Sequence, residues 1–151
     1  MITRVIRFTG LLVPMIAVGL AVMGMSGLGG SEGPTRIPTP DRNFGATIVD
    51  RADVHTQVTM FSIGGYTYFF GQRGKGQLAV PFELINRADF RVTPEGLEVV
   101  LNLKDGQNVI LNASRKQDCF GRTSVGNFQI TLENIKMIIL GSQIVAPEGK
   151  K

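Results

Sequence analysis

The stretch LEVVLNLKDGQNVIL, residues 97–111, decides the fold class of this chain. Apolar residues occupy every second position from Leu97 to Leu103, which is the period of a strand with one buried face. Asp105-Gly106 then supplies the positive backbone angles of a tight turn, and the alternation resumes after it. The stretch therefore predicts an antiparallel β-hairpin.

Strand-like patterning extends from residue 44 to residue 140, and no helical period is sustained over three turns. Further strands are expected near residues 46–52, 57–63, 66–70, 77–82, 86–90, 127–132 and 135–140. A sheet of this size must protect its edges from pairing with other chains. We therefore predict an all-β domain, a small sandwich or closed barrel of about 9–10 strands, in preference to an open sheet.

Two stretches separated by fifty residues resemble each other: GQLAVPFELINRADF, residues 76–90, and GNFQITLENIKMIIL, residues 126–140. Identical residues at this offset are Phe70-Gly71 with Phe120-Gly121, Gly76 with Gly126, Glu83 with Glu133 and Ile85 with Ile135. This pattern predicts a duplication with repeats at residues 46–90 and 96–140, and the alternative is coincidence among similar strands. Further upstream the alternation fails at this offset, because Arg51 stands where Leu101 does.

Residues 1–29 have the composition of a signal peptide or an N-terminal transmembrane anchor. Arg4 and Arg7 form a positive start, and 24 uncharged positions follow. The densest apolar part, residues 11–25, suits a cleaved signal, whereas residues 8–28 are long enough for a spanning helix. Both alternatives place the domain in the periplasm or on the outer face of the cytoplasmic membrane, since positive residues remain on the cytoplasmic side.

The segments that flank the domain differ from it in composition. Residues 30–43 contain three prolines and few apolar side chains, which predicts an extended, solvated linker. Residues 141–151 contain the glycine, proline and charge of a flexible tail.

The basic net charge of +4 comes from the ends of the chain. Four of the 16 positive residues are Arg4, Arg7, Lys150 and Lys151, so 12 remain against 12 acidic residues. A domain without an excess of positive charge lacks the footprint that nucleic acid requires. We therefore expect no nucleic-acid partner.

The stretch GGYTYFFGQRGKGQ combines aromatic and basic residues. Tyr66, Tyr68 and Phe70 are expected on one strand face, followed by Arg73 and Lys75 in the adjoining loop. Such a mixture can stack on a base or a sugar and hold an anion. The preferred interpretation is a core-facing aromatic strand that ends in a turn, and the absence of tryptophan weakens a carbohydrate site.

Four other residues are candidates for chemistry. Glu83 and Glu133 are interpreted as exposed turn residues, with the alternative that they face each other as paired carboxylates for acid–base work or a cation. Cys119 is expected to be a buried, inert thiol, and as the single cysteine it forms no internal disulfide. One histidine, His55, cannot build a typical zinc site. We therefore predict no catalytic residues, no metal and no cofactor.

These observations favour an exported, non-enzymatic all-β binding or accessory module of a cell-envelope assembly. A retained N-terminal segment tethers the module to the membrane, and a protein partner in the envelope is expected. The alternative is a periplasmic or secreted ligand-binding protein whose site is the segment from Tyr66 to Lys75. An enzyme that uses Glu83, Glu133 or Cys119 is the third possibility.

Overall fold

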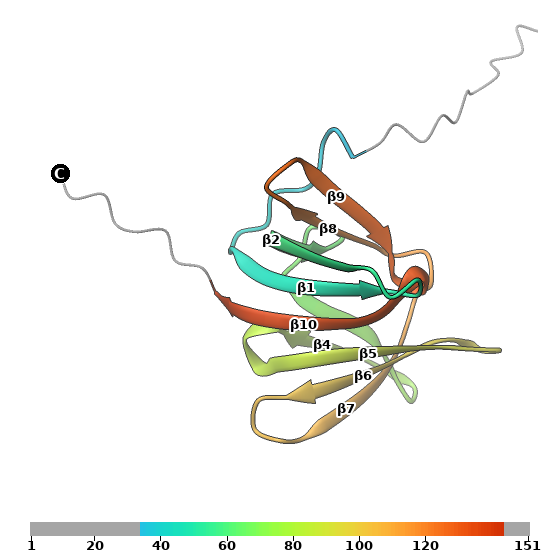
Figure 1. The fold of residues 1–151 in the computed structure, drawn as a ribbon. Helices are drawn as coiled ribbons and strands as arrows, with labels where there is room; N and C mark the ends of the chain where they lie inside the picture. The colour runs from blue at the N-terminus through green and yellow to red at the C-terminus, as the bar shows by residue number, and fades with distance from the viewer. Residues whose placement is uncertain (1–33, 144–151) are drawn as a thin grey trace, which may run out of the picture. The chain divides into compact units, whose positions relative to one another are not determined.

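The computed structural model describes residues 34–143, which form ten β-strands and two 3-10 turns but no α-helix (Figure 1). The strands are β1 (Phe44–Asp50), β2 (His55–Ile63), β3 (Tyr68–Arg73), β4 (Gly76–Pro81), β5 (Ile85–Thr93), β6 (Gly96–Leu103), β7 (Asn108–Ala113), β8 (Asp118–Arg122), β9 (Asn127–Thr131) and β10 (Ile135–Gln143). The turns are η1 (Phe82–Leu84) and η2 (Leu132–Asn134). Within residues 34–143, no helix has the length and hydropathy that a membrane span requires. The predicted N-terminal helix lies outside the described residues.

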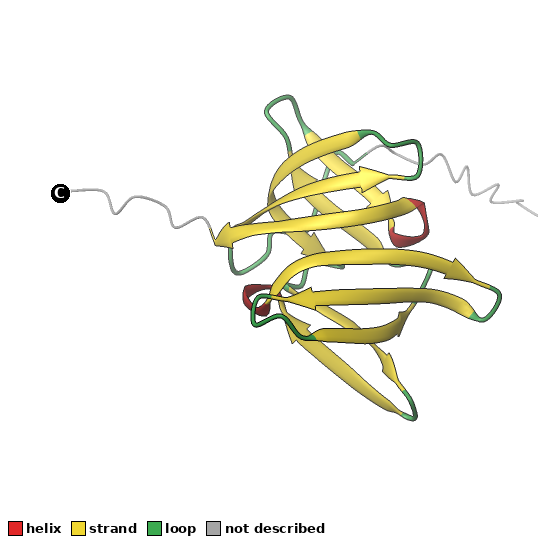
Figure 2. Ribbon diagram, turned by 60° about the horizontal axis from the view of Figure 1, so that its bottom comes forward, coloured by secondary structure: helices red, strands yellow, loops and turns green. Residues whose placement is uncertain are grey.

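All ten strands lie in a single antiparallel sheet with the order β4-β3-β7-β6-β5-β10-β1-β2-β8-β9. The sheet curls into a half-barrel, and β4 and β9 are its edges (Figure 2). The predicted all-β class and number of strands are confirmed. The sandwich or closed barrel is replaced by one curled sheet, in which curvature covers the apolar face without a closing strand pair in the described part of the chain.

The hairpin predicted from residues 97–111 is confirmed as β6 and β7. Leu97, Val99 and Leu101 are buried on the inner face, as the alternation predicts. Gly106 has φ 89° in the connecting turn, a conformation that glycine adopts without steric cost.

The strand order has an internal symmetry. If each strand is replaced by the strand five places away along the chain, β1 by β6 and so on, the result is the same order read in reverse. β5 and β10 are therefore neighbours at the centre of the sheet, and β4 and β9 lie at its two ends. The 3-10 turns are also related, because they begin at Phe82 and Leu132, fifty residues apart.

The first hairpins of the two halves are related by a different offset. The hydrogen bond from Asp50 N to Val54 O recurs from Leu103 N to Gln107 O, an offset of 53 rather than 50 residues. The offset changes within β2, where Met60 has φ 51° and the pairing with β8 shifts register. The alternation in β1 therefore matches that of β6 only after a shift of three residues.

The core lies on the inner face of the curl and surrounds the 3-10 turn η1. Phe82 is fully buried, and its ring centroid lies 5.2 Å from that of Phe61, 5.5 Å from that of Phe69 and 5.6 Å from that of Phe44. These partners come from β1, β2 and β3, so one side chain joins three strands. The buried side chain of this turn thus fills the interior of this part of the half-barrel.

Half of residues 34–43 are exposed, but the segment also contacts the sheet at specific points. The Arg42 guanidinium forms an ion pair with the carboxylate of Glu83 in η1. Asn43 Oδ1 accepts a hydrogen bond of 2.8 Å from the Met60 N–H. The composition of this segment did not predict these contacts, because they depend on side chains far away in the sequence.

Candidate functional site

The aromatic residues of the expected binding segment face outward. The rings of Tyr66 and Tyr68 stack with centroids 5.1 Å apart. Tyr66 is 57% exposed and Phe70 is 43% exposed, whereas Phe69 points inward and is buried. The preferred interpretation of a core-facing aromatic strand is therefore wrong for these residues, because Phe69 rather than its neighbours fills the core.

The structure does not bring the aromatic and basic residues of this segment together. Tyr68 begins β3, while Arg73 ends it and Lys75 lies in the turn to β4. Five residue steps along a strand separate the Cα atoms of Tyr68 and Arg73 by about 17 Å. Both basic side chains are exposed at the tip of this hairpin.

Glu83 and Glu133 lie at opposite ends of the two central strands. η1 leads directly into β5 and η2 directly into β10, and these strands run antiparallel. Figure 2 shows the two turns far apart in the sheet. The register separates the carboxylates by roughly ten residue steps, or about 30 Å. The structure therefore does not bring them together as a carboxylate pair.

Cys119 and His55 are also far from forming a reactive pair. Cys119 is buried in the core, and its burial raises the pKa of its thiol far above the usual value. His55 is exposed at the start of β2. No group of three or more potential metal-ligating side chains occurs within residues 34–143.

The turn between β1 and β2 provides a test of surface electrostatics. Asp53 Oδ1 lies 2.6 Å from Lys136 Nζ, and this hydrogen bond and charge lower the pKa of Asp53 from its ordinary value of 3.8. We expect Lys136→Gln to raise the pKa of Asp53 toward that value in a carboxyl NMR titration. Because the folded pKa is lowered, the pair stabilises the fold above about pH 3.8 and loses this contribution as the pH falls through the folded pKa. An unchanged Asp53 titration in the variant would contradict the pairing.

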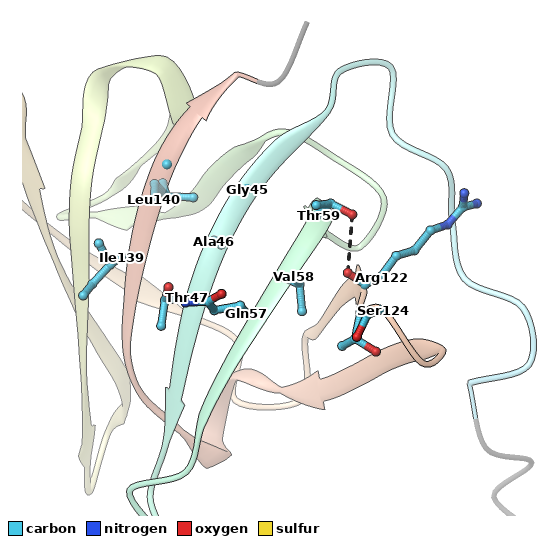
Figure 3. A pocket seen from close by; sticks show the side chains of 12 residues that line it. Gly45, Ala46, Thr47, Gln57, Val58, Thr59, Arg122, Ser124, Ile139 and Leu140 are labelled. Atoms are coloured by element: carbon cyan, nitrogen blue, oxygen red, sulfur yellow. Dashed lines mark hydrogen bonds between the residues drawn. The ribbon is translucent and has the colours of Figure 1, made fainter. Parts of the chain in front are cut away.

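A groove of about 690 Å³ lies on the outer face of the sheet, and we call it the β1–β2 groove (Figure 3). It crosses four adjacent strands, β10, β1, β2 and β8, and ends at the turn after β8. The residues that line it are Gly45, Ala46, Thr47, Gln57, Val58, Thr59, Arg122, Thr123, Ser124, Ile139, Leu140 and Gly141.

Two glycines lie side by side in the lining of the β1–β2 groove. Gly45 and Gly141 lie on neighbouring strands, and a Cβ atom added at Gly141 would lie 3.2 Å from the Gly45 carbonyl oxygen. The pairing of β2 with β8 also shifts register between Thr59 and Ser62, next to the groove. The groove therefore adjoins a break in regular pairing.

Arg122 is the one charged side chain among the described residues that line this groove. Its side chain extends from the rim toward the segment that precedes β1, where Nη2 lies 3.5 Å from Thr39 Oγ1 (Figure 3). Its backbone oxygen accepts a hydrogen bond of 3.4 Å from Thr59 Oγ1, which fixes the base of the side chain. Hydroxyl groups thus line a partly apolar floor and one cation lies at the rim, an arrangement suited to an acidic group.

A second groove of about 590 Å³, the β3–β7 groove, lies where the β3–β4 hairpin meets β7. Its lining residues are Phe70, Gly71, Gln72, Gln77, Glu95, Gly96, Asn112, Ala113, Ser114, Lys116 and Gln117. Gln72 pairs with Asn112 across this junction, as Arg122 pairs with Thr59 across the other. The two grooves therefore adjoin equivalent junctions of the two halves, but their other lining residues are not equivalent and their chemistry differs.

Patterns in the sequence identify neither groove as a site. Each groove gathers residues from distant segments that meet at a strand junction, and alternation does not reveal which strands meet. The one available signal was the Phe-Gly pair that occurs at Phe70-Gly71 and again at Phe120-Gly121, because both glycines lie at these junctions.

Comparison with other proteins identifies the family of the chain. No curated protein and no solved structure matches it. A family model described as "Uncharacterised protein" matches residues 40–143, a range that includes all ten strands and both grooves. Because this match covers more than half of the chain, the protein belongs to that family.

Proposed function

We propose that this protein is an exported, non-enzymatic binding or accessory module of a cell-envelope assembly, and that its β1–β2 groove receives an acidic segment of a protein partner. The observation that carries this proposal is the position of Arg122, a cation at the rim of a groove whose other described lining residues are uncharged. Charge complementarity of this kind directs association and fixes orientation. The groove itself is built on paired strands, which hold such a site more firmly than loops do.

The proposed location rests on the composition of residues 1–29. Their positive start and long uncharged stretch are typical of export signals and membrane anchors. A retained anchor tethers the domain to the membrane. Partners at the membrane surface are the expected ligands.

The proposal predicts that partner binding depends on Arg122. A photoreactive residue placed at Ser124 should crosslink an envelope protein in intact cells, and Arg122→Gln should weaken that crosslink about tenfold or more. A synthetic peptide of the crosslinked acidic segment should bind the purified protein with the same dependence. Arg73→Gln is the matched control, since it removes an exposed arginine from the tip of the other hairpin.

The alternative is a free ligand-binding protein that uses the segment from Tyr66 to Lys75. It predicts the reverse result, in which Arg73→Gln weakens binding and Arg122→Gln does not. Membrane fractionation with mass spectrometry of the mature N-terminus separates the two locations. An intact Met1 in the membrane fraction supports a tethered accessory module, whereas a soluble protein that starts near residue 27–32 supports the alternative.

We also infer that the domain consists of two related units. The palindromic strand order, the two 3-10 turns and the paired junctions support a duplication. The register supports the duplication as well. Ala88 pairs with Leu101 in one half, and Ile138 pairs with Ile48 in the other. These two pairs correspond, because Ile138 follows Ala88 by 50 residues and Leu101 follows Ile48 by 53.

A further inference from the structure

Three amide side chains form a row across the β3–β7 groove. Gln72 of β3 lies opposite Gln77 of β4 on one side and opposite Asn112 of β7 on the other. All three are exposed, so their amide groups face solvent rather than the core. Neighbouring strands are about 4.8 Å apart, so the row extends about 10 Å across the sheet. This length is comparable to that of a disaccharide.

An aromatic ring lies beside this row on the same face of β3. Phe70 is two residues before Gln72 and is 43% exposed. The residue opposite it on β4 is Ala79, whose small side chain leaves space beside the ring. The strand that carries the Phe70 ring is held in position, because the neighbouring residues Phe69 and Gly71 pack against the core.

The charges at the margin of the groove cancel, and hydrogen bonds connect the loops that carry them. Glu95 and Lys116 are both exposed lining residues, so the groove carries one charge of each sign. Arg115 joins the two loops that contain them, since it donates to the carbonyl oxygens of Thr93 and Gly96. The site is therefore neutral overall and its two walls are connected.

From this geometry we propose that the β3–β7 groove binds a neutral oligosaccharide. Each amide both donates and accepts hydrogen bonds, as a sugar hydroxyl does, so a row of amides matches a row of hydroxyl groups. The exposed face of Phe70 packs against the C–H face of a pyranose ring. This site is separate from the β1–β2 groove, and its occupancy does not depend on the partner proposed there.

Other ligand classes fit the groove less well. An acidic ligand meets Glu95 as well as the single lysine in this lining, and a nucleic acid needs an excess of positive charge. A peptide bound through apolar side chains needs pockets, whereas most of the lining here is amide, hydroxyl or glycine. The combination of amides with one aromatic face favours a saccharide.

The proposal can be tested by NMR titration of the full chain with neutral tetrasaccharides of glucose and of N-acetylglucosamine. The side-chain amide signals of Gln72, Gln77 and Asn112 should shift together with those of backbone groups near Phe70. Asn112→Ala and Phe70→Ala should each weaken the binding about tenfold, while Phe70→Tyr should retain it because the ring face remains. Spectra of each variant without ligand confirm that it is folded.

Two control variants separate this site from other surfaces. Ile110→Ala removes an exposed apolar side chain from β7 outside the groove and should leave the affinity unchanged. Arg122→Gln should also leave saccharide binding unchanged, so that a failure of the proposed partner site and a failure of this site are distinguished. The proposal is overturned if no neutral tetrasaccharide shifts these amides at millimolar concentration, or if acidic saccharides or extended peptides bind there instead.

Discussion

Replacement of Phe82 by alanine should lower the free energy of unfolding by about 3–5 kcal/mol, the largest effect expected for a single substitution in this domain. The side chain is fully buried, and it contacts aromatic rings from three different strands. Its removal leaves a cavity that those strands cannot fill, since hydrogen-bonded pairing fixes their positions.

Urea denaturation followed by circular dichroism measures this loss. Leu84→Ala is the matched control, because Leu84 lies in the same 3-10 turn but is 54% exposed. That substitution should change stability by less than about 1 kcal/mol. Equal losses for the two variants would show that the turn itself, rather than the buried ring, stabilises the fold.

Gly121→Ala should destabilise the domain by about 3 kcal/mol, at the upper end of the range for overpacking. A Cβ atom at this position would lie 2.6 Å from Val58 Cβ, closer than two non-bonded carbon atoms can approach. The overlap cannot relax easily, because β8 and β2 are paired with each other and with further strands. The glycine is therefore required by the close approach of β2 rather than by its backbone angles.

Two comparisons identify the cause of this loss. Gly126→Ala should be nearly neutral, because a Cβ atom there meets nothing within 4 Å. Val58→Gly should destabilise the wild type by creating a cavity, but it removes the Cβ atom that a side chain at position 121 would meet first and should relieve the overlap in Gly121→Ala. The double variant should therefore lose less stability than the sum of the two single losses. Additive losses in thermal or urea unfolding would contradict the steric explanation.

Local patterns in the sequence predicted every strand except β8, and they predicted the sheet poorly. The hairpin from Leu97 to Leu111 was predictable because alternation and a turn signal lie within a single short stretch. The path of the sheet depends on which strands meet, and the β3–β4 hairpin joins β7 rather than a strand of its own half. Such long-range pairing leaves no periodic mark in the sequence.

The prediction for the aromatic segment shows a second limit. Alternation placed Tyr68 and Phe70 on one face, but it could not determine whether that face is inner or outer. The adjacent Phe69 occupies the core, and its burial determines the orientation of the strand. The offset of fifty residues had a similar limit, since an irregular conformation at Met60 conceals the relation between β1 and β6.

The exchange of hairpins between the two halves has a consequence for how the domain is made. A nascent chain that has been synthesised only as far as β5 already contains β3, yet β7, the strand that receives β3, does not exist. Native pairing must therefore wait until most of the polypeptide is available, and the closing contacts join segments distant in sequence, which is typical of slow folding. The domain becomes stable in one cooperative step rather than half by half.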